Sequence, residues 1–305
     1  MKLVSIITVN FNQPSVTESL IESIYRQENY SPLEIIVVDN GSTANPVPKW
    51  EKEYKGIRFI RSEKNLGFAG GNNLGIRQAK GDYLFLVNND TEFTENLVGR
   101  LVAEMEANPE IGMLSPRINY FDQPDMIQYA GYTPMNYYTA RNGCIGQFET
   151  DRGQYTSVKG PTAYAHGAAM MVRREALEKA GLMAENYFLY YEELDWCERI
   201  KRAGFSINVF LEPLIYHKES VSVGKKTALK EYFMNRNRIL FIRRNTSTST
   251  FFVFMCYFLV FVAPRNLVTY LRDGNYDFIP VFFRAITWHL SHDVDSDDLG
   301  YVLKS

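Results

Sequence analysis

The chain has 305 residues, of which 46% are hydrophobic and 22% are charged, and its net charge is −2. These values are typical of a globular protein and give no overall basic field, so we expect no nucleic-acid partner. The three cysteines, Cys144, Cys197 and Cys256, lie far apart without metal-site spacing, which favours a reduced cytoplasmic protein. The N-terminal stretch MKLVSIITVNFN is apolar for only a few residues and predicts a strand rather than a signal peptide.

Apolar runs and amphipathic segments alternate over the first hundred residues. Strands are expected at 3–9, 33–38, 57–60 and 83–87, and helices at 14–27, in the residues up to Ala79, and at 94–107. This alternation predicts an α/β fold with a mainly parallel sheet and helices on both faces. Polar clusters follow three of the strands, at 10–12, 39–42 and 88–90. Because functional sites in such sheets lie at the carboxyl ends of the strands, the three clusters should meet at one edge.

The middle of the chain has a different character. Residues 115–165 are rich in Tyr, Gly, Pro and Asn and show little periodicity. They indicate loops and short antiparallel strands that form a wall on one side of the site. Beyond them we expect strands at 167–173, 205–211 and 214–216, and helices at 174–181 and 193–203.

Several of these polar residues have two interpretations. Asp90 ends a strand behind two asparagines, where it can bind Mg²⁺ or Mn²⁺, although Asn-Asn-Asp also suits a simple turn. Asp39 can accept hydrogen bonds from a base or ribose, or form an Asx turn with Gly41. The glycine-rich segment 65–75 matches neither a dinucleotide fingerprint nor a Walker loop, but its glycines can let the backbone approach a diphosphate.

An acidic cluster follows the aromatic run at 187–191. A carboxylate partly desolvated by these aromatics can act as a general base. The alternative is that acidic residues simply stabilise the start of an amphipathic helix through its dipole. His217, at a later strand end, is either a metal ligand or a structural histidine.

Seven stretches occur in a fixed order over about residues 3 to 223: VSIITVNFN, IIVVDNGS, NLGFAGGNNLGI, YLFLVNND, GAAMMVRREALEKAGL, YYEELDWCERIKRAG and LIYHKESVS. Together they resemble the inverting family 2 glycosyltransferases with the GT-A fold, and within that family the bacterial rhamnosyltransferase-like members. The resemblance implies a nucleotide-sugar pocket formed by six residues: Phe11, Asp39, Asn65, Gly71, Asn73 and Asn89.

The resemblance also implies a metal site and a catalytic base. Asp90 stands at the last position of the family's Asp-x-Asp motif, and His217 matches a histidine that binds the metal in some members, with Mg²⁺ or Mn²⁺ as the cofactor. Glu193 matches the catalytic base, with Glu192 or Asp195 as alternatives.

Two departures from the family pattern affect these expectations. Asn88 replaces the first acid of the metal motif, which removes one anionic ligand, and Glu193 stands where the acidic pair usually ends in Asp. A catalytically impaired nucleotide-sugar-binding or scaffold protein of the same fold is therefore the alternative. A sugar nucleotidyltransferase would normally show a basic glycine-rich loop, and residues 10–20 contain no Lys or Arg.

The C-terminal residues predict a helical extension, 226–305, beside a catalytic domain, 1–225. Residues 228–245 read as a helix with a basic face that contains Arg236, Arg238, Arg243 and Arg244. The apolar run 250–263 has about 14 residues and ends at Pro264 and Arg265, which is short of the ~20 needed to span a bilayer. We expect it, with the aromatic-rich piece 278–290, to lie in a membrane interface. The alternative is packing on the catalytic domain or in a homodimer.

The expected activity is transfer of a sugar from a dTDP- or UDP-sugar to a hydroxyl of a glycan or lipid-linked glycan. Rhamnose is the donor sugar that the resemblance favours. This places the chain in bacterial cell-surface polysaccharide synthesis, at the cytoplasmic face of the inner membrane.

Overall fold

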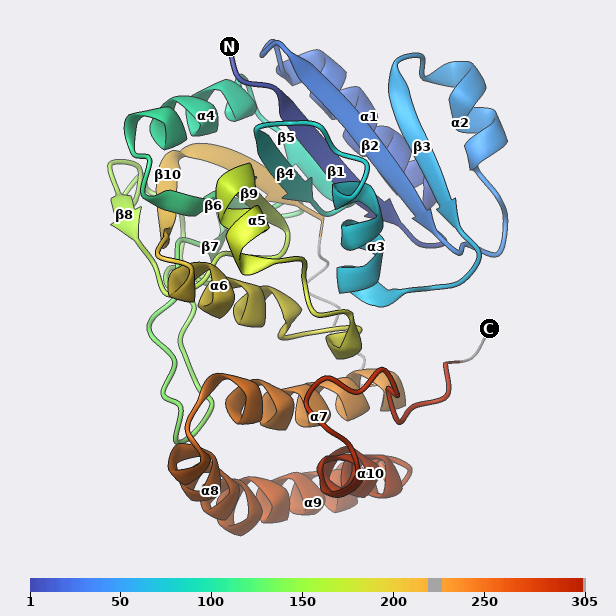
Figure 1. The fold of residues 1–305 in the computed structure, drawn as a ribbon, viewed down its shortest axis with the longest axis vertical. Coiled ribbons are helices and arrows are strands. Elements are labelled where there is room, and N and C mark those ends of the chain that lie inside the picture. Colours follow the sequence, from blue (N-terminus) through green and yellow to red (C-terminus); the bar gives the residue numbers. More distant parts are fainter. Residues whose placement is uncertain (219–226, 304–305) are drawn as a thin grey trace.

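The computed structural model describes residues 1–218 and 227–303. A mixed sheet flanked by helices forms the larger part of the molecule, and the C-terminal helices form a separate layer beneath it (Figure 1). The expected border between residues 225 and 226 lies within the segment 219–226, which is outside the described residues.

The first half of the sheet is parallel. Its strands are β3 (Ile57–Ser62), β2 (Leu33–Asn40), β1 (Val4–Asn10) and β4 (Tyr83–Val87), in that spatial order. Successive side chains of a strand point to opposite faces, and Ile6 and Ile7 accordingly belong to two separate cores. The helices of this half are α1 (Pro14–Gln27), α2 (Val47–Glu53) and α3 (Gly67–Ile76). The sequence reading missed α2, which is short and follows a proline-containing turn.

The second half of the sheet is mixed. The order continues through β9 (Ala169–Arg173), β6 (Ile111–Tyr120), β10 (Ser206–His217) and β5 (Thr91–Phe93), while β7 (Ile127–Tyr129) pairs with β6 and β8 (Lys159–Pro161) pairs with β10. The two strands expected at 205–211 and 214–216 form one strand, β10, with an irregularity between Val209 and Leu214. β6 is buried along its whole length, so it lacks the alternating pattern that would have revealed it.

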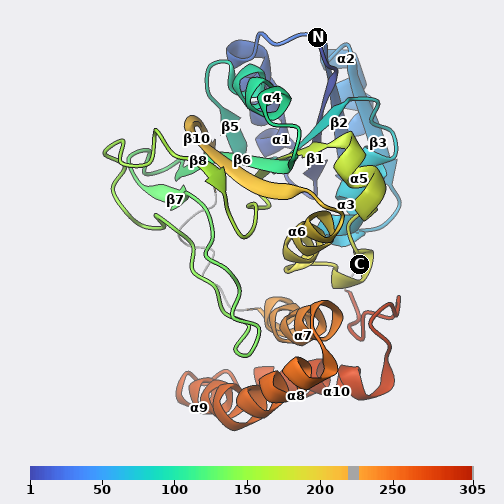
Figure 2. The same cartoon turned by 60° about the vertical axis from the view of Figure 1, so that its left-hand side comes forward.

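The remaining helices of this part are α4 (Leu97–Ala107), α5 (Arg174–Ala180), the short 3₁₀ helix η1 (Glu185–Tyr187) and α6 (Glu192–Arg202). α6 lies between the sheet and the C-terminal layer in both views (Figures 1 and 2). It thus carries the acidic cluster into the junction of the two parts.

The C-terminal layer contains α7 (Ala228–Asn245), α8 (Thr248–Tyr257), the π-helical turn η2 (Phe258–Val262), α9 (Ala263–Arg272) and α10 (Phe278–Ser291). The expectation of an exposed basic face on α7 is wrong for Arg236, which is fully buried with its guanidinium 4.7 Å from the ring centre of Trp288. Arg243 and Arg244 donate to backbone oxygens of His292 and Val294. These arginines hold the C-terminal tail because their donors match the free carbonyls of irregular backbone.

Pro264 does not end the apolar segment, contrary to the expectation from sequence. One continuous helix runs from Thr248 to Arg272, 25 residues in all. The turn before the proline is π-helical, with the Ala263 N–H bonded to the Phe258 oxygen. A proline ring clashes with the carbonyl four residues back in a regular α-helix, and the wider turn relieves that clash.

Candidate functional site

The polar clusters after β1, β2 and β4 meet at one edge of the sheet, as predicted. Asn10 Nδ2 donates to Asp39 Oδ1 at 2.7 Å, and Thr17 Oγ1 donates to Asn10 Oδ1 at 3.0 Å. Asn89 Nδ2 donates to Thr17 Oγ1 at 3.1 Å. A continuous chain of hydrogen bonds therefore joins the ends of the three strands through α1.

Asp39 lies behind this edge rather than on its surface. Its side chain is fully buried and forms an ion pair with Arg61, which also donates to the Ser42 oxygen at 2.8 Å. Burial is tolerated because the carboxylate is paired with a charged donor and with Asn10. A nucleotide would reach Asp39 only if Arg61 moved.

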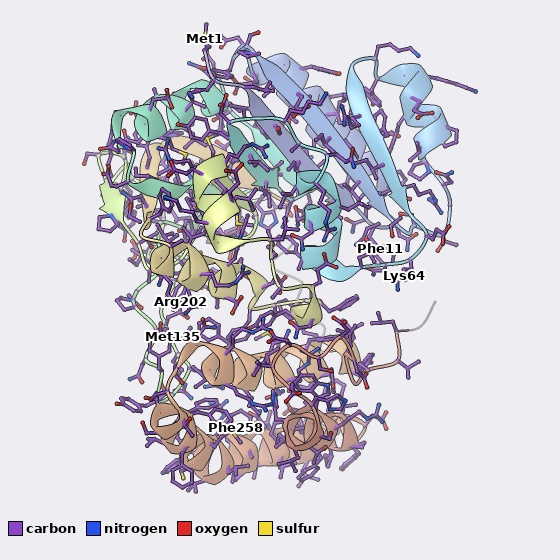
Figure 3. The ribbon with its side chains drawn as sticks, in the orientation of Figure 1. Met1, Phe11, Lys64, Met135, Arg202 and Phe258 are labelled. Carbon is purple, nitrogen blue, oxygen red and sulfur yellow. The ribbon has the colours of Figure 1, made fainter. Side chains whose placement is uncertain are left out.

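A cavity of about 410 Å³ opens at the same edge. Four of the residues predicted to bind substrate or metal line it: Phe11, Asn65, Asn89 and Asp90. Phe11 is 44% exposed, and Figure 3 places it near Lys64 at the lower end of the parallel strands. An exposed aromatic ring at the mouth of a polar cavity is suited to stacking on a planar base.

The loop after β3 shapes one wall of this cavity through Asn40. The Asn40 amide donates to the oxygens of Asn65 and Gly67, and its carbonyl accepts from the Leu66 N–H. Gly67 has φ +72°, and an added Cβ would lie 2.1 Å from the Phe188 oxygen. Only glycine fits there, because both the positive φ and the nearby Phe188 carbonyl exclude a side chain.

Two predicted pocket residues lie outside the cavity lining. Gly71 packs α3 closely on β1, since a Cβ would lie 2.8 Å from Val9 Cγ1. Asn73 donates to the Met183 oxygen and to Glu185 Oε1, both at 2.9 Å. Both residues fix the position of α3 beneath the cavity.

Asp90, which lines the cavity, lies next to His217, as predicted. His217 Nδ1 lies 2.8 Å from Gln128 Oε1, and its Nε2 lies 3.3 Å from Asn88 Nδ2. A carbonyl oxygen only accepts hydrogen bonds, so Nδ1 donates to Gln128 and Nε2 faces Asn88 and Asp90. Gln128 thereby orients the ring, and no sequence pattern predicted this role.

The residues at this point fit a divalent cation. Asp90 Oδ1 lies 3.0 Å from His217 Nε2, and it is buried without a hydrogen bond from the described residues. Two ligands of an octahedral ion with bonds of ~2.1 Å lie about 3.0 Å apart, as these atoms do. Within 1–218 and 227–303, no group of three or more His, Cys, Asp and Glu side chains is arranged to hold a metal ion. The protein would thus supply two ligands, and substrate oxygens the others.

The acidic pair stands at the start of α6 after a strained loop. Phe188, Tyr190 and Tyr191 have φ values of +63°, +72° and +75°, a region that non-glycine residues rarely occupy. The side-chain amide of Asn237, on α7, compensates by donating to three oxygens of this loop at 2.7–2.8 Å. The C-terminal layer therefore stabilises the backbone conformation of this loop.

Glu192 and Glu193 have different surroundings. Glu192 is 3% exposed, and burial and the neighbouring Glu193 charge raise its pKa well above the usual carboxyl value. Burial also raises the pKa of Glu193, although its side chain is only partly covered. Glu193 Cγ and the Phe68 ring both lie within 4 Å of a Cβ built on Gly167, and Phe68 lines the cavity.

A row of three rings runs from His217 through His166 to Tyr132. The His166 ring centre lies 6.2 Å from that of His217 and 6.3 Å from that of Tyr132. The negative charge of Glu193 contributes, after burial, to the raised pKa of the Tyr132 hydroxyl. Burial and the His217 charge lower the pKa of His166 to about 3, so this imidazole is neutral. His166 and Tyr132 were missed because they lie in the segment without clear periodicity.

Asp195 faces away from this group of residues. It is fully buried, pairs with Arg199 at 2.9 Å and accepts from the Asn245 amide at 2.9 Å. Its oxygens are thus occupied in joining α6 to α7.

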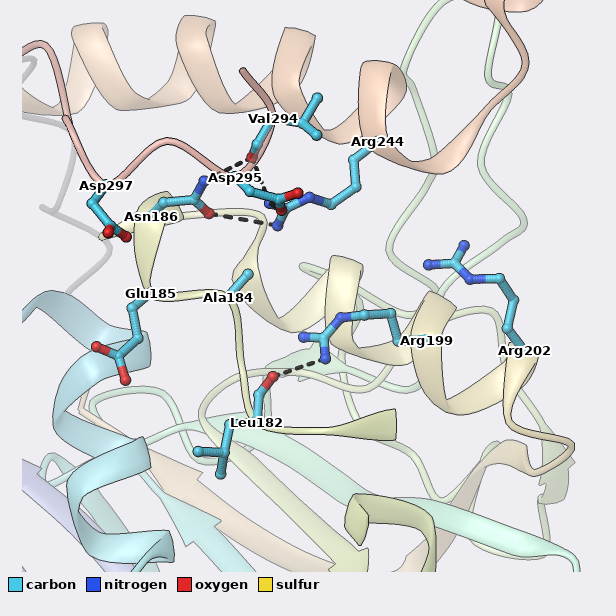
Figure 4. A pocket seen from close by; sticks show the side chains of 10 residues that line it. All are labelled: Leu182, Ala184, Glu185, Asn186, Arg199, Arg202, Arg244, Val294, Asp295 and Asp297. Carbon is cyan, nitrogen blue, oxygen red and sulfur yellow. Dashed lines mark hydrogen bonds and ion pairs between the residues drawn. The ribbon is translucent and has the colours of Figure 1, made fainter. Parts of the chain in front are cut away.

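A further cavity of about 470 Å³ lies between α6 and the C-terminal tail. Figure 4 shows Arg244 reaching Asn186 and Val294, and Arg199 reaching Leu182. Arg244 donates to the Val294 oxygen and to Asp295, and Arg199 donates to the Ala180 and Leu182 oxygens, so these two arginines join α6 and α7 to the neighbouring loop and tail.

The comparisons with known proteins agree with this architecture. The sequence model described as "Glycosyl transferase family 2" matches residues 5–181. The low-salt glycan biosynthesis hexosyltransferase Agl10 of Haloferax volcanii is 28% identical over 77% of this chain and 74% of its own length. The N-acetylglucosaminyl-diphospho-decaprenol L-rhamnosyltransferase of Mycobacterium tuberculosis is 24% identical over 65% of this chain and 70% of its own length. An uncharacterized protein of Sinorhizobium fredii is 26% identical over 82% of this chain, which spans 28% of that protein.

Solved structures show the same fold. The mannosyltransferase PcManGT of Pyrobaculum calidifontis, in complex with GDP-Man and Mn²⁺, matches with a TM-score of 0.55 and 16% identity over 96% of this chain and 76% of its own. GalNAc-T7 with UDP, GalNAc and Mn²⁺ matches with a TM-score of 0.59 and 16% identity over 78% of this chain and 51% of its own. Together with the family match over residues 5–181, this shows that the chain belongs to glycosyl transferase family 2, has the GT-A fold and is a glycosyltransferase.

Proposed function

We propose that the protein is an inverting transferase that moves a sugar from a pyrimidine nucleotide donor to a hydroxyl of a lipid-linked glycan. The observation that carries the proposal is the cavity that Phe11 shares with Asp90, close to the partly exposed Glu193. One end of this cavity suits a base, the other suits a cation and diphosphate, and a proton acceptor lies next to it. These are the three requirements of nucleotide-sugar transfer.

We assign the donor to the cavity edge. Phe11 stacks on the base, while Asn65 and Asn89 supply hydrogen bonds along the cavity wall. Asp39 keeps Arg61 and Asn10 in place behind them, and Gly71 and Asn73 set the position of α3. The rhamnosyltransferase relative favours a dTDP-rhamnose donor, with UDP-sugars next.

Asp90 and His217 would hold Mg²⁺ or Mn²⁺ together with the donor diphosphate. Such a cation, when bound, neutralises the charge that develops on the leaving diphosphate. Asn88 lowers the negative charge of the protein ligands, so binding of the cation should depend on the donor. Two solved neighbours of this fold are complexes with Mn²⁺, which supports this assignment.

Glu193 acts as the general base in this proposal. Its carboxylate takes the proton of the acceptor hydroxyl, the hydroxyl oxygen forms a bond to the anomeric carbon, and the bond from that carbon to the diphosphate oxygen breaks. Attack from the face opposite the leaving group inverts the anomeric configuration. The partly exposed Glu193 reaches an acceptor more easily than the buried Glu192, whereas Asp195 is engaged by Arg199.

The helix Thr248–Arg272 supports a membrane location. Its most apolar stretch of 18 residues has a mean hydropathy of 1.9, and only 22% of that stretch is buried in the molecule. Phe252, Val260 and Phe261 are 63–68% exposed. We therefore place the C-terminal layer in the interface of the inner membrane, with the catalytic part on the cytoplasmic side and a surface polysaccharide as the product.

Thermal-shift screening with dTDP-, UDP- and GDP-sugars tests the donor site. Stabilisation should appear with one nucleotide class plus Mn²⁺, reaching about 2.7 kcal/mol at a ligand concentration of 100 times Kd. Asp90→Asn should lose the Mn²⁺-dependent part of this shift and keep the folded baseline. No stabilisation by any of the three nucleotides would refute the proposed donor site. Binding without turnover would instead favour the scaffold alternative.

A further inference from the structure

A cavity of about 690 Å³ lies on the membrane side of the catalytic loop. The long loop between β7 and β8 reaches down to the C-terminal helices (Figure 2). Its residues 140–142 line one side of the cavity, and residues of α7 and α9 line the other. The cavity is lined by Arg141, Arg238 and Arg265, with Lys230 at its edge. Among its lining residues, Glu231 is the one carboxylate.

The three guanidinium groups lack acidic partners. Within the described ranges 1–218 and 227–303, no carboxylate lies within 4.0 Å of Arg141, Arg238 or Arg265. Glu231 offsets only one of the positive charges in the lining, and its Oε1 accepts from the Tyr270 hydroxyl and the Asn235 amide. Like charges gathered without counterions are unfavourable, so the cavity is suited to an anion.

Two buried donors in the same lining are also unused. Arg238 Nε and Asn142 Nδ2 are both buried without a hydrogen-bond partner among the described residues. A buried donor left unpaired is unfavourable, and a bound acceptor group would satisfy it. Phosphate oxygens are strong acceptors for guanidinium donors.

Tyr191 connects this cavity to the acidic pair. Its ring lines the cavity, and it directly precedes Glu192 at the start of α6. Burial raises the pKa of its hydroxyl to about 12, while the positive charge of Arg238 lowers it and the negative charge of Glu193 raises it. The Tyr191 hydroxyl is thus close enough to feel both Arg238 and Glu193. A molecule with an anionic group at Arg238 can therefore place a neighbouring sugar near Glu193.

An apolar helix surface adjoins the cavity. Arg265 belongs to the helix Thr248–Arg272, whose outer side exposes Val260, Phe261 and Val268 at 63–64%. An occupant with a phosphate group and a hydrocarbon tail would satisfy the arginines and continue along this apolar helix into the bilayer. Free phosphate or a soluble glycan would use only part of the surface.

We infer that the basic cavity binds the diphosphate of a lipid-linked acceptor, with its hydrocarbon tail along the helix Thr248–Arg272 and its sugar directed toward Glu193. The inference rests on the proposed transferase function, because it names the acceptor class for that site. It assigns a binding role to Arg141, Arg238 and Arg265, which lie outside the donor cavity.

Direct binding tests the cavity without the reaction. Full-length protein in detergent is titrated with farnesyl diphosphate and with farnesol, in EDTA so that metal-dependent binding at the donor site is suppressed. Farnesyl diphosphate should bind and farnesol should bind far more weakly. Arg141→Gln combined with Arg265→Gln should raise the Kd for farnesyl diphosphate on the order of tenfold or more, because charge-assisted hydrogen bonds are lost. The exposed Arg272→Gln, on the same helix, is the matched control and should leave this Kd unchanged.

Equal binding by the double variant and the wild type would overturn the inference, whether or not the protein transfers sugar. A transfer assay with a diphosphate-lipid-linked sugar gives a second readout. There the double variant should raise the acceptor KM and leave the donor KM unchanged. Vesicles of phosphatidylglycerol test for simple attraction to anionic lipid. Such attraction would weaken vesicle binding equally in Arg272→Gln and in the double variant. If neither variant then changes the Kd for farnesyl diphosphate, the cavity is not an acceptor site. If neither variant nor wild type transfers sugar, but farnesyl diphosphate binding follows the prediction, only the proposed reaction fails.

Discussion

Glu192 and Glu193 are adjacent in the sequence, and the start of α6 gives them different chemistry. In the proposed mechanism Glu193 acts as a carboxylate, and burial raises its pKa. Activity should therefore rise with pH along an acidic limb that lies above the usual carboxyl range, which a kcat/KM profile measures. Glu193→Gln should lower kcat by about 10²–10⁴-fold, the usual contribution of a general base. A variant with wild-type kcat and profile would exclude Glu193 as the base.

Glu192→Gln is the matched control for this prediction. A carboxyl with a raised folded-state pKa loses stability as pH rises through that pKa, because the buried group must then carry a charge. The neutral amide avoids this loss. We expect Glu192→Gln to keep most of the activity and to be more stable than the wild type at alkaline pH, as measured by denaturant unfolding.

Gly67 and Gly56 allow backbone strain to be separated from steric contact. Both have positive φ, +72° and +85°, but a Cβ on Gly67 would meet the Phe188 oxygen while nothing lies within 4 Å at Gly56. Gly56→Ala should cost about 1–2 kcal/mol of unfolding free energy from its backbone angle alone. Gly67→Ala should cost at least about 1 kcal/mol more and weaken donor binding, because the cavity wall must move. Equal losses in the two variants would contradict this role of Gly67.

The sequence located the site better than it assigned individual contacts. Asp90 and His217 are adjacent as predicted, since both end strands of one sheet. Asp39 could not be placed from sequence, because its ion pair with Arg61 depends on the neighbouring strand β3. His166 and Gln128 were missed for the same reason: their contacts join segments that are distant in sequence and lack a periodic pattern.

At the scale of elements, burial pattern decided what could be predicted. The parallel strands β1, β2 and β4 are short apolar runs between turn residues, and their positions were predicted within a few residues. The irregularity in β10 and the π-helical turn before Pro264 follow from tertiary packing and local backbone adjustment. A proline usually ends a helix, so the length of the Thr248–Arg272 helix was underestimated.

The outer side of this helix gives a prediction for membrane binding. Val260→Glu combined with Phe261→Glu should change the unfolding free energy by no more than about 0.5 kcal/mol, because both side chains are more than 60% exposed. The same change should strongly reduce co-sedimentation with vesicles, since charged groups are costly in the apolar interior. The buried Phe258→Ala is the opposite control and should cost about 3–5 kcal/mol. Undiminished sedimentation of the double variant would exclude this side as the membrane contact.

At the scale of the whole molecule, the C-terminal layer stabilises the loop that precedes the acidic pair. Asn237 on α7 binds three carbonyls of the loop that precedes the acidic pair, and Arg236 donates to the Asn186 oxygen in the same loop. Residues 188–191 hold unfavourable backbone angles only because such contacts over-determine them. Residues 226–305, expected as a helical extension, are thus bound to this loop through α7, and the loop would relax without that helix.

Asn237→Ala tests this dependence, with Asn245→Ala as its matched control. Both asparagines lie on α7 and bind the region of α6, but Asn245 bonds to Asp195, away from the cavity. Each variant should lose about 1–3 kcal/mol of unfolding free energy, because each leaves buried oxygens without a donor. Only Asn237→Ala should also lower kcat, by about 10²-fold, since a shift of about 1 Å in a catalytic group has an effect of that size. If the two variants lose activity equally, in proportion to stability, then α7 supports the fold alone and does not position Glu193.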